Sequence, residues 1–415
     1  MKDSLCAVCK GKGLCGRPCP ILAKFRATER ISPIGDSISG ASPPSVFVGR
    51  MGYPNIRAGP LVPPLITAKD APVYDDPRSW LSKSIEDVIS LRSNLVRSNL
   101  RLNVKDARIS TNRLLVKIQE LAMASTPVDT EVHFYKPPKR ELRFDDVLSP
   151  MGPSGMIKTL EITENPSVPR KVDHLVFDTD VLARDAIGEL YKGDISTYYI
   201  CRLLSVGLLG RQGDRRLVPT RWSITATDDV IGKELITQVK SYSELDEIRV
   251  FSAQKFGNRF EILLLPKIFS FELIEIWLPK SVWMSKGTWI GEDREGYDGR
   301  TTYSHLAGGY YAARLGVLEY LERIRRQALV FVVREILPDY WAPLGSWVIR
   351  ETVRNAMAQQ PKRFDAIEEA IGDLAMRIRT PLSKWRTKAK LLADYKFQKT
   401  LANLFTDKTR ECSSC

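Results

Sequence analysis

The chain has 415 residues, with 62 lysines and arginines against 49 aspartates and glutamates, which gives a formal net charge of +13. This length predicts two or three domains, and a composition of 43% hydrophobic and 27% charged residues excludes a largely disordered, collagen-like or coiled-coil protein. The positive charge makes a polyanion the expected partner: DNA, RNA or an acidic membrane surface.

The first residues, MKDSLCAVCK, contain no apolar signal core. Apolar runs such as Ala328–Val333 are far shorter than the roughly 18 residues that span a bilayer. We therefore expect a soluble, cytoplasmic, nucleoid-associated protein without a membrane partner.

Four of the seven cysteines lie within the first nineteen residues, as CxxC, five further residues and CxxxC. These cysteines are Cys6, Cys9, Cys15 and Cys19. Thiolates at this spacing close a tetrahedral metal site, and the glycines between them permit tight turns. We expect a structural zinc element over residues 1–20. An iron–sulfur cluster, which uses the same ligands, and unliganded thiols stay open as alternatives.

Residues 32–76 are rich in Pro, Gly and Ser, which argues against a regular helix or a central strand. Such a stretch is typical of a flexible linker. However, Val46, Phe47, Tyr53 and Ile56 are too apolar for a solvated linker. The alternative is an ordered loop region over residues 21–80 that wraps a core.

Apolar residues then recur at helical spacing from Ile85 to Leu102 and again from Leu114 to Leu121. The positions opposite carry basic residues, which we interpret as one basic helical face that is either solvated or in contact with phosphates. These residues are Arg92, Arg97, Arg101, Lys105, Arg108 and Arg113.

Residues 81–300 are predicted to form a mixed α+β core domain. Arg249–Gln254 and Arg259–Leu265 flank Gly257 and Asn258, a hairpin signal, and Phe269–Trp277 predicts a further strand. Val172–Phe177 is another predicted strand, so that His133 and His174 are both expected in strands as structural histidines. Cys201 is expected in the core.

Residues 301–395 are predicted to form a helical C-terminal domain. Its longest helix is expected from Tyr310 to Ile336, where Pro338 stops it. Later helices are predicted over Ser346–Met357, Phe364–Ile378 and Leu382–Tyr395. Residues 396–415 are expected to be a flexible tail.

The tail contains a pattern that combines a glutamine with apolar residues three, six and seven places later. These residues are Gln398, Leu401, Leu404 and Phe405. One short helical turn presents the three apolar side chains together. The pattern resembles the peptide with which proteins bind the PCNA sliding clamp, although Leu404 stands where an aromatic residue is usual. Cys412 and Cys415 form a further CxxC in the tail, which we expect to be inert; metal binding and a switch by oxidation stay open as alternatives.

Two acidic segments are weak candidates for a metal-dependent nuclease, which needs carboxylates to hold divalent ions beside a phosphodiester. Asp228 and Asp229 follow SITAT, where a strand is expected to end, and Glu292 and Asp293 lie in GEDREGYDGR. His305 borders the second segment and is a candidate for acid–base work. Solvated loop acids explain the same pattern.

Arginines and aromatic residues cluster in Val48–Pro60, around Trp222 and in Thr301–Tyr311. Such residues cradle a nucleotide or a flipped base by stacking and hydrogen bonding, which suggests a nucleotide- or NAD-using transferase as one enzymatic alternative. The candidates are Arg50, Tyr53, Arg57, Arg221, Trp222, Tyr303 and His305. Core packing explains most of these aromatics equally well, because no familiar phosphate-loop motif accompanies them.

Four segments occur in order ahead of the clamp-binding-like tail: CAVCKGKGLCGRPCP, VFVGRMGYPNIRAGP, VPTRWSITATDD and WAPLGSWVIRETVR. In this order they resemble the archaeal Nre family of DNA repair proteins. The resemblance implies a role in the repair of DNA damage, recruitment by PCNA through the tail residues named above, and zinc at the four N-terminal cysteines. It implies no particular catalytic reaction.

We therefore expect an α+β protein with an N-terminal four-cysteine zinc element, a mixed α/β central domain and a helical C-terminal domain. Its expected partners are DNA, the PCNA clamp and other repair factors. A repair enzyme proper is the first alternative, either a metal-dependent nuclease or a nucleotide-using transferase. A zinc-bearing RNA-binding protein is the second.

Overall fold

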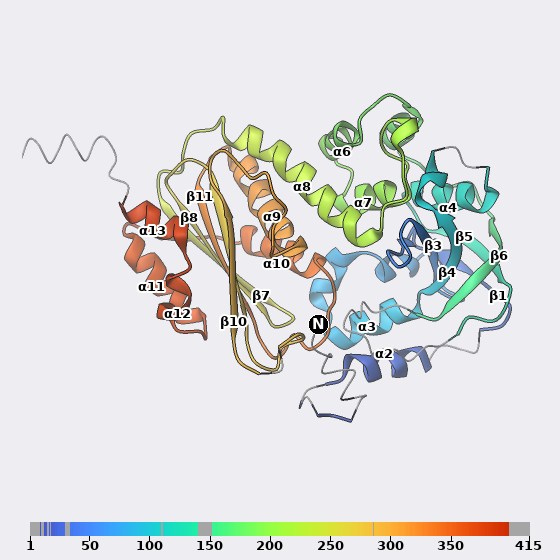
Figure 1. Ribbon diagram of the computed structural model, residues 1–415, viewed down its shortest axis with the longest axis horizontal. Coiled ribbons are helices and arrows are strands. Elements are labelled where there is room, and N and C mark those ends of the chain that lie inside the picture. The colour runs from blue at the N-terminus through green and yellow to red at the C-terminus, as the bar shows by residue number, and fades with distance from the viewer. Residues whose placement is uncertain are drawn as a thin grey trace, which may run out of the picture.

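The structure, a computed structural model, describes Cys9, residues 12–14, Gly16, and residues 18–29, 34–108, 111–139, 152–284 and 286–397. The described strands form two six-stranded mixed sheets, β1–β6 and β7–β12. Figure 1 shows these sheets at opposite ends of the molecule, with helices packed between them. The expected α+β class is confirmed.

The strands of the first sheet have the spatial order β1-β5-β6-β4-β3-β2. Only β4 and β6 pair in parallel. The strands are β1 (Ser37–Ser42), β2 (Val46–Val48), β3 (Asn55–Val62), β4 (Val96–Asn103), β5 (Val128–Phe134) and β6 (Ser154–Ile162). His133 lies in β5, as expected.

The Pro- and Gly-rich segment is neither a linker nor only a loop, because it contains β1, β2 and β3. The expectation that it holds no central strand is wrong, since β3 lies between β2 and β4. Pro60 removes one donor from β3, but the next residue, Leu61, donates its N–H to the carbonyl of Ser45. At Gly59 a Cβ atom would lie 1.6 Å from the carbonyl oxygen of Ser98, so the close approach of β3 to β4 requires glycine.

Six of the α-helices that the structure describes belong to the same half of the chain. They are α2 (Pro20–Glu29), α3 (Ile85–Asn94), α4 (Arg113–Met123), α5 (Arg170–Phe177), α6 (Ala183–Lys192) and α7 (Thr197–Ser205). Short 3-10 helices are η1 (Ala71–Tyr74), η2 (Pro77–Ser82), η3 (Val104–Ala107) and η4 (Gln212–Asp214). Cys201 is buried in α7, and burial raises the pKa of its thiol to about 12.

Two sequence predictions fail here. The helical spacing that starts at Ile85 ends at Asn94, after which the chain forms β4. Arg92, Arg101 and Arg113 therefore lie on three different elements, and no single basic helical face exists. Val172–Phe177 is part of α5, because its buried residues recur at helical spacing, and His174 lies on this helix.

The second sheet has the spatial order β10-β9-β11-β8-β7-β12. Its strands are β7 (Ile248–Lys255), β8 (Asn258–Leu265), β9 (Ser270–Trp277), β10 (Trp289–Glu295), β11 (Leu329–Ile336) and β12 (Lys362–Phe364). The predicted hairpin of β7 and β8 and the predicted strand β9 are confirmed.

The predicted helix from Tyr310 to Ile336 is two elements. Helix α9 (Gly308–Ile324) ends where Arg325 adopts a left-handed conformation with φ of 53°, and the chain then forms β11. All eight residues of β11 are buried between β9, with which it is parallel, and β8, with which it is antiparallel. Residues 301–395 are therefore not wholly helical, and their sheet continues across the boundary expected near residue 300.

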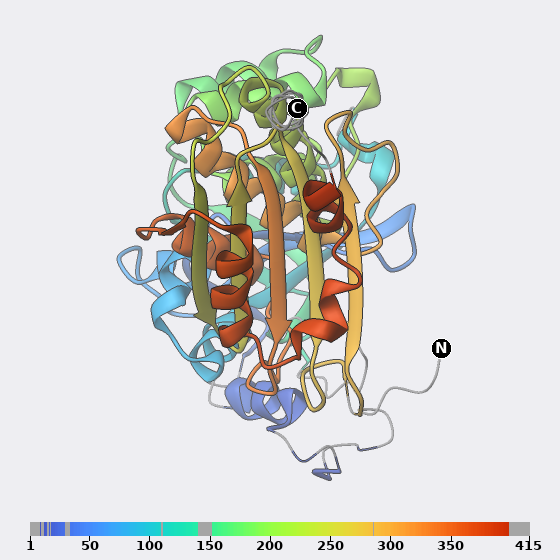
Figure 2. The same ribbon diagram turned by 90° about the vertical axis from the view of Figure 1, so that its left-hand side faces the viewer.

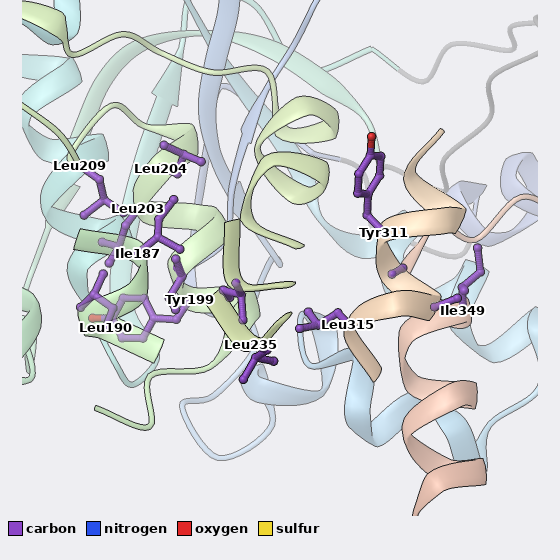
Figure 3. Close-up of a cluster of buried hydrophobic side chains, with 14 of the residues drawn as sticks. Ile187, Leu190, Tyr199, Leu203, Leu204, Leu209, Leu235, Tyr311, Leu315 and Ile349 are labelled. Atoms are coloured by element: carbon purple, nitrogen blue, oxygen red, sulfur yellow. The ribbon is translucent and has the colours of Figure 1, made fainter. Parts of the chain in front are cut away.

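The remaining helices cover the two faces of the second sheet. They are α8 (Thr220–Val239), α10 (Trp347–Met357), α11 (Ile367–Arg377), α12 (Leu382–Arg386) and α13 (Lys390–Phe397). Helices α8, α9 and α10 lie between the two sheets, whereas α11, α12 and α13 lie on the outer face, as Figures 1 and 2 show. Leu235 of α8, Leu315 of α9 and Ile349 of α10 join one hydrophobic core with residues of both sheets (Figure 3).

Buried glutamates on the outer face of the second sheet hold the C-terminal helices. Glu261 accepts from Nε of Arg377 at 2.9 Å, and Glu335 accepts from the backbone N–H of Thr380 at 2.8 Å. Glu272 accepts from the backbone N–H groups of Lys390 and Leu391, in the first turn of α13, at 2.8 and 2.9 Å. Burial raises the pKa of Glu272 to about 7, although these two donors favour the ionised form.

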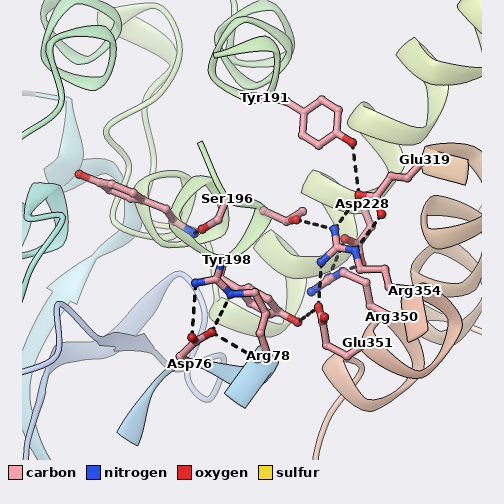
Figure 4. A network of polar contacts seen from close by, with 12 residues as sticks. Asp76, Arg78, Tyr191, Ser196, Tyr198, Asp228, Glu319, Arg350, Glu351 and Arg354 are labelled. Atoms are coloured by element: carbon pink, nitrogen blue, oxygen red, sulfur yellow. Dashed lines mark hydrogen bonds and ion pairs between the residues drawn. The ribbon is translucent and has the colours of Figure 1, made fainter. Parts of the chain in front are cut away.

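A buried network of charges joins the helices between the sheets (Figure 4). Nη2 of Arg350 in α10 contacts both carboxylate oxygens of Asp228 in α8 at 2.6 Å. Arg354, also in α10, bonds Glu319 of α9 at 2.6 Å and Glu351 at 2.8 Å. The hydroxyl of Tyr198 in α7 donates to Glu351 at 2.6 Å. Four helices are thereby fixed relative to one another.

Replacing Asp228 by asparagine leaves the buried Arg350 without its countercharge. We expect Asp228→Asn to lower the free energy of unfolding by about 3 kcal/mol in chemical denaturation. Adding Arg350→Met to that variant should recover part of the loss, because the uncompensated charge is removed. Asp298→Asn, in an exposed loop, is the control, and equal stability of Asp228→Asn and this control would contradict the prediction.

Candidate nucleic-acid interface

The connection between β2 and β3 reaches the first turn of α8. The backbone N–H of Val48 donates to Oγ1 of Thr220 at 2.9 Å, and the N–H of Gly49 donates to the carbonyl of Arg57 at 2.8 Å. Gly52 has a φ of +81°, and a Cβ atom there would lie 2.7 Å from the carbonyl oxygen of Asn55. These contacts fix the tip of the hairpin, residues 49–54, against the start of the helix.

Two aromatic rings meet where the hairpin tip contacts α8. The ring centroids of Tyr53 and Trp222 are 5.3 Å apart, with the planes inclined by 55°. Tyr53 is 46% exposed and Trp222 is 45% exposed, so each ring keeps about half of its surface in solvent. Large aromatic side chains usually bury most of their surface. This pair is therefore a candidate binding surface rather than part of the core.

Two arginines face each other across β3 and β4. Arg57 and Arg101 are directly opposite in the antiparallel register, and both are exposed. Like charges in this arrangement destabilise a sheet. Arg50, in the hairpin tip, and Arg221, beside Trp222, are exposed as well. Within the described residues none of these four arginines forms an ion pair with a carboxylate.

The other basic candidates lie elsewhere. Nη1 of Arg92 pairs with Asp75 at 2.6 Å, and its guanidinium lies 5.7 Å from the ring centroid of Trp80, so this residue is part of the packing around η1 and η2. Arg97 shares β4 with Arg101 but is half-buried. Of Arg92, Arg97 and Arg101, only Arg101 is exposed and lies opposite Arg57.

Tyr303 and His305 lie in the loop between β10 and α9. Tyr303 is 63% exposed, and its ring centroid lies 5.4 Å from that of Tyr311. Nδ1 of His305 is 3.4 Å from Oδ2 of Asp293, which also accepts from Arg300 at 2.9 Å. Burial alone would raise the pKa of Asp293, but hydrogen bonds from Ser304 and Arg300 outweigh it and hold the pKa below its ordinary value.

The acidic candidates do not form a metal site in the structure. Asp228 and Asp229 lie in the middle of α8, not after a strand, and their arginine partners are Arg350 and Arg314. Glu292 points to the outer face of the second sheet, where it raises the pKa of Glu272. No group of three or more metal-ligating side chains that could hold an ion occurs in the part of the chain that the structure describes.

Only half of the predicted zinc ligands can be placed. Cys9 is 4% exposed and Cys19 is half-buried, whereas Cys6 and Cys15 lie outside the described residues. The N–H of Lys12 donates to the carbonyl of Cys9 at 2.8 Å, and Gly13 and Gly16 both have positive φ. Tight turns of this kind fit a site whose ligands are close in sequence.

The predicted clamp-binding residues also lie outside the described residues. Helix α13 ends at Phe397, immediately before Gln398, Leu401, Leu404 and Phe405. The same holds for Cys412 and Cys415. In the described part of the chain, no helix combines the length and the apolarity that crossing a membrane requires.

Two family profiles together match most of the chain. One, described as "Archaeal Nre, N-terminal", matches residues 14–284, and the other, "Archaeal Nre, C-terminal", matches residues 295–404. The chain belongs to the archaeal Nre family. The resemblance of the four sequence segments is thus confirmed over nearly the whole length.

Several Nre proteins resemble this chain closely. It is 44% identical to DNA repair protein NreA of Archaeoglobus fulgidus over 92% of this chain and 95% of the relative. It is 38% identical to DNA repair protein NreB of the same organism, over 93% and 96% of the two chains. It is also 38% identical to DNA repair protein NreA of Haloferax volcanii, over 86% and 87%. No solved structure matches the chain.

Sequence reasoning found most residues of this interface but missed two that position it. Thr220, which accepts from Val48, and Tyr311, which packs against Tyr303, were not singled out. The sequence contains no signal for the first contact, because it joins residues 172 positions apart. For the contact between Tyr303 and Tyr311, the only indication in the sequence is the run GGYY, which is equally typical of an ordinary helix.

Proposed function

We propose that this Nre protein binds DNA through the surface around the hairpin tip and is recruited to the PCNA clamp through its C-terminal tail. The relatives named above are DNA repair proteins, and a role in DNA repair follows for this family member. One observation carries the DNA-binding proposal: Arg57 and Arg101 face each other without an acidic partner in the described structure.

The positive charges of Arg57 and Arg101 repel each other, which destabilises the folded protein. A bound polyanion would neutralise both charges and remove this repulsion. A strand of nucleic acid presents phosphates at regular spacing, and each arginine that neutralises a phosphate releases condensed counterions. Arg50 and Arg221 extend the positive surface toward the aromatic pair. The four guanidinium groups are exposed, so phosphate contact requires no change in the fold.

Tethering to the clamp would allow a small basic surface to bind DNA effectively. A peptide bound to a ring that encircles DNA raises the local concentration of the attached body, so modest DNA affinity becomes effective. Glu272 and Glu335 hold the last helices on the outer face of the second sheet. Helix α13, which directly precedes the tail in sequence, therefore lies on the side of this sheet that faces away from the first sheet and its arginines (Figures 1 and 2).

The test of DNA binding uses Arg57→Gln with Arg101→Gln. We expect this variant to bind a DNA oligonucleotide about tenfold more weakly than the wild type at about 100 mM salt, with a salt slope reduced by about two. Fluorescence anisotropy measures both quantities. The fold should be kept, because a repulsion is removed. Arg92→Gln, whose arginine pairs with Asp75, is the matched control, and equal affinity of all three proteins would refute the proposal.

The test of clamp recruitment uses Leu401→Ala with Phe405→Ala. We expect the wild type to bind the clamp of the same organism in calorimetry with a free energy of about 8 kcal/mol, and the variant not to bind. Asn403→Ala, within the same peptide but not an anchor, should retain binding. A double variant with wild-type clamp affinity would exclude the tail as the clamp ligand.

We further propose that Cys6, Cys9, Cys15 and Cys19 bind one structural zinc ion that staples the N-terminus to the body. Metal analysis of the purified protein should find about one zinc per chain, lost on Cys9→Ser with Cys19→Ser. Cys201→Ser, at a buried cysteine of the core, should keep the metal. Iron instead of zinc, or no metal in the wild type, would contradict this assignment.

A further inference from the structure

We propose that the DNA bound at this interface is an unpaired strand, whose bases stack on the Tyr53–Trp222 pair and, farther along helix α8, on Tyr303. This inference rests on the DNA binding proposed above and adds the form of DNA that the site selects. The inference is based on two exposed aromatic groups, the Tyr53–Trp222 pair and Tyr303, and on the facing arginines of β3 and β4.

The two aromatic groups are connected through α8 and α9. Trp222 is in the first turn of α8. One turn later, Thr225 contacts the start of α9, because its Oγ1 lies 3.1 Å from the position that a Cβ atom of Gly308 would occupy. Asp229 pairs with Arg314 of α9 at 2.8 Å, and that guanidinium lies 5.3 Å from the ring centroid of Tyr311. Trp222, Thr225 and Asp229 are spaced three and four residues apart, as residues of one helix face are.

The second aromatic group is connected to α8 through Arg314 and Tyr311. Asp229 follows Trp222 by seven positions, which corresponds to about 10 Å along a helix. Tyr303 packs against Tyr311, whose ring lies beside the guanidinium of Arg314, and is 63% exposed. We therefore expect a flexible unpaired strand to reach both aromatic groups with two of its bases.

The exposed ring surfaces favour unpaired bases over a duplex. In a duplex the faces of the bases are covered by their neighbours, so a half-exposed aromatic side chain finds no base face to stack on. Proteins that bind single strands combine a basic groove for the backbone with aromatic side chains for the bases. Arg57 and Arg101 supply the charge beside Tyr53, four residues along the hairpin.

The one acid along this side of α8 does not repel a strand. Asp229 is paired with both Arg314 and Lys233, at 2.8 and 2.7 Å, so its charge is neutralised. The bond from Val48 to Thr220 holds the hairpin tip on the helix within the protein itself. The aromatic surface is thus preorganised, and binding requires little ordering of side chains.

The test compares a single-stranded oligonucleotide that carries one 2-aminopurine with the same sequence in a duplex. Wild-type protein should bind the single strand more tightly and quench the 2-aminopurine fluorescence, because quenching reports stacking. Trp222→Ala should weaken single-strand binding about tenfold and abolish the quenching, and should leave duplex binding within about twofold. Trp222→Phe should restore most of the single-strand affinity.

Two further variants separate stacking from general damage. Tyr303→Ala should weaken single-strand binding less than Trp222→Ala does, because a tyrosine ring offers a base a smaller face than a tryptophan ring does. Trp283→Ala removes another exposed tryptophan, 56% exposed and packed on Trp277, and should change neither affinity.

Several outcomes would overturn the inference. Stacking would be refuted if the wild type bound single strand and duplex equally well without quenching. It would also be refuted if Trp222→Ala lost the same affinity for both DNA forms. Either result would leave DNA binding through the arginines intact. Tighter binding of an RNA strand of the same sequence would make RNA the occupant. If no nucleic acid binds and Arg57→Gln with Arg101→Gln changes nothing, the proposed function itself fails.

Discussion

The ion pair between Asp228 and Arg350 is the constraint on which the arrangement of the two sheets depends. Both side chains are almost fully buried, so neither charge has water to solvate it and each requires the other. The pair joins α8 to α10, and a second ion pair, from Arg354 to Glu319, joins α10 to α9. Because these helices fill the space between the sheets, their mutual positions decide where the first sheet lies relative to the second.

Helix α8 connects this buried network to the surface. Its inward side carries Asp228, while Trp222 in its first turn is half exposed beside the hairpin tip of the first sheet. The tip is bonded to the same turn through Val48 and Thr220. A helix held so firmly in the core is a suitable platform for recognition, because a ligand does not have to order it first.

The C-terminal helices are attached by a different device. Buried carboxylates of the second sheet accept backbone N–H groups at Thr380 and in the first turn of α13, so Glu335 and Glu272 satisfy donors that would otherwise be unpaired. The attachment fixes α13, whose last residue, Phe397, directly precedes the predicted clamp-binding peptide in sequence. Family membership makes DNA repair the role of this protein, and the proposals for clamp, zinc and unpaired DNA describe how its parts serve that role.

Local pattern in the sequence was enough for the family, the hairpin of β7 and β8, the helix at Trp347–Met357 and the candidate residues Tyr53, Arg57 and Trp222. These features depend on residues close together in the chain. Only the tertiary structure showed that Leu329–Ile336 is a central strand and that Arg101 faces Arg57, because strand pairing joins segments far apart in sequence and an apolar run suits a buried strand as well as a helix. The sequence determined which residues were available for binding, and the register between distant strands decided which of them meet.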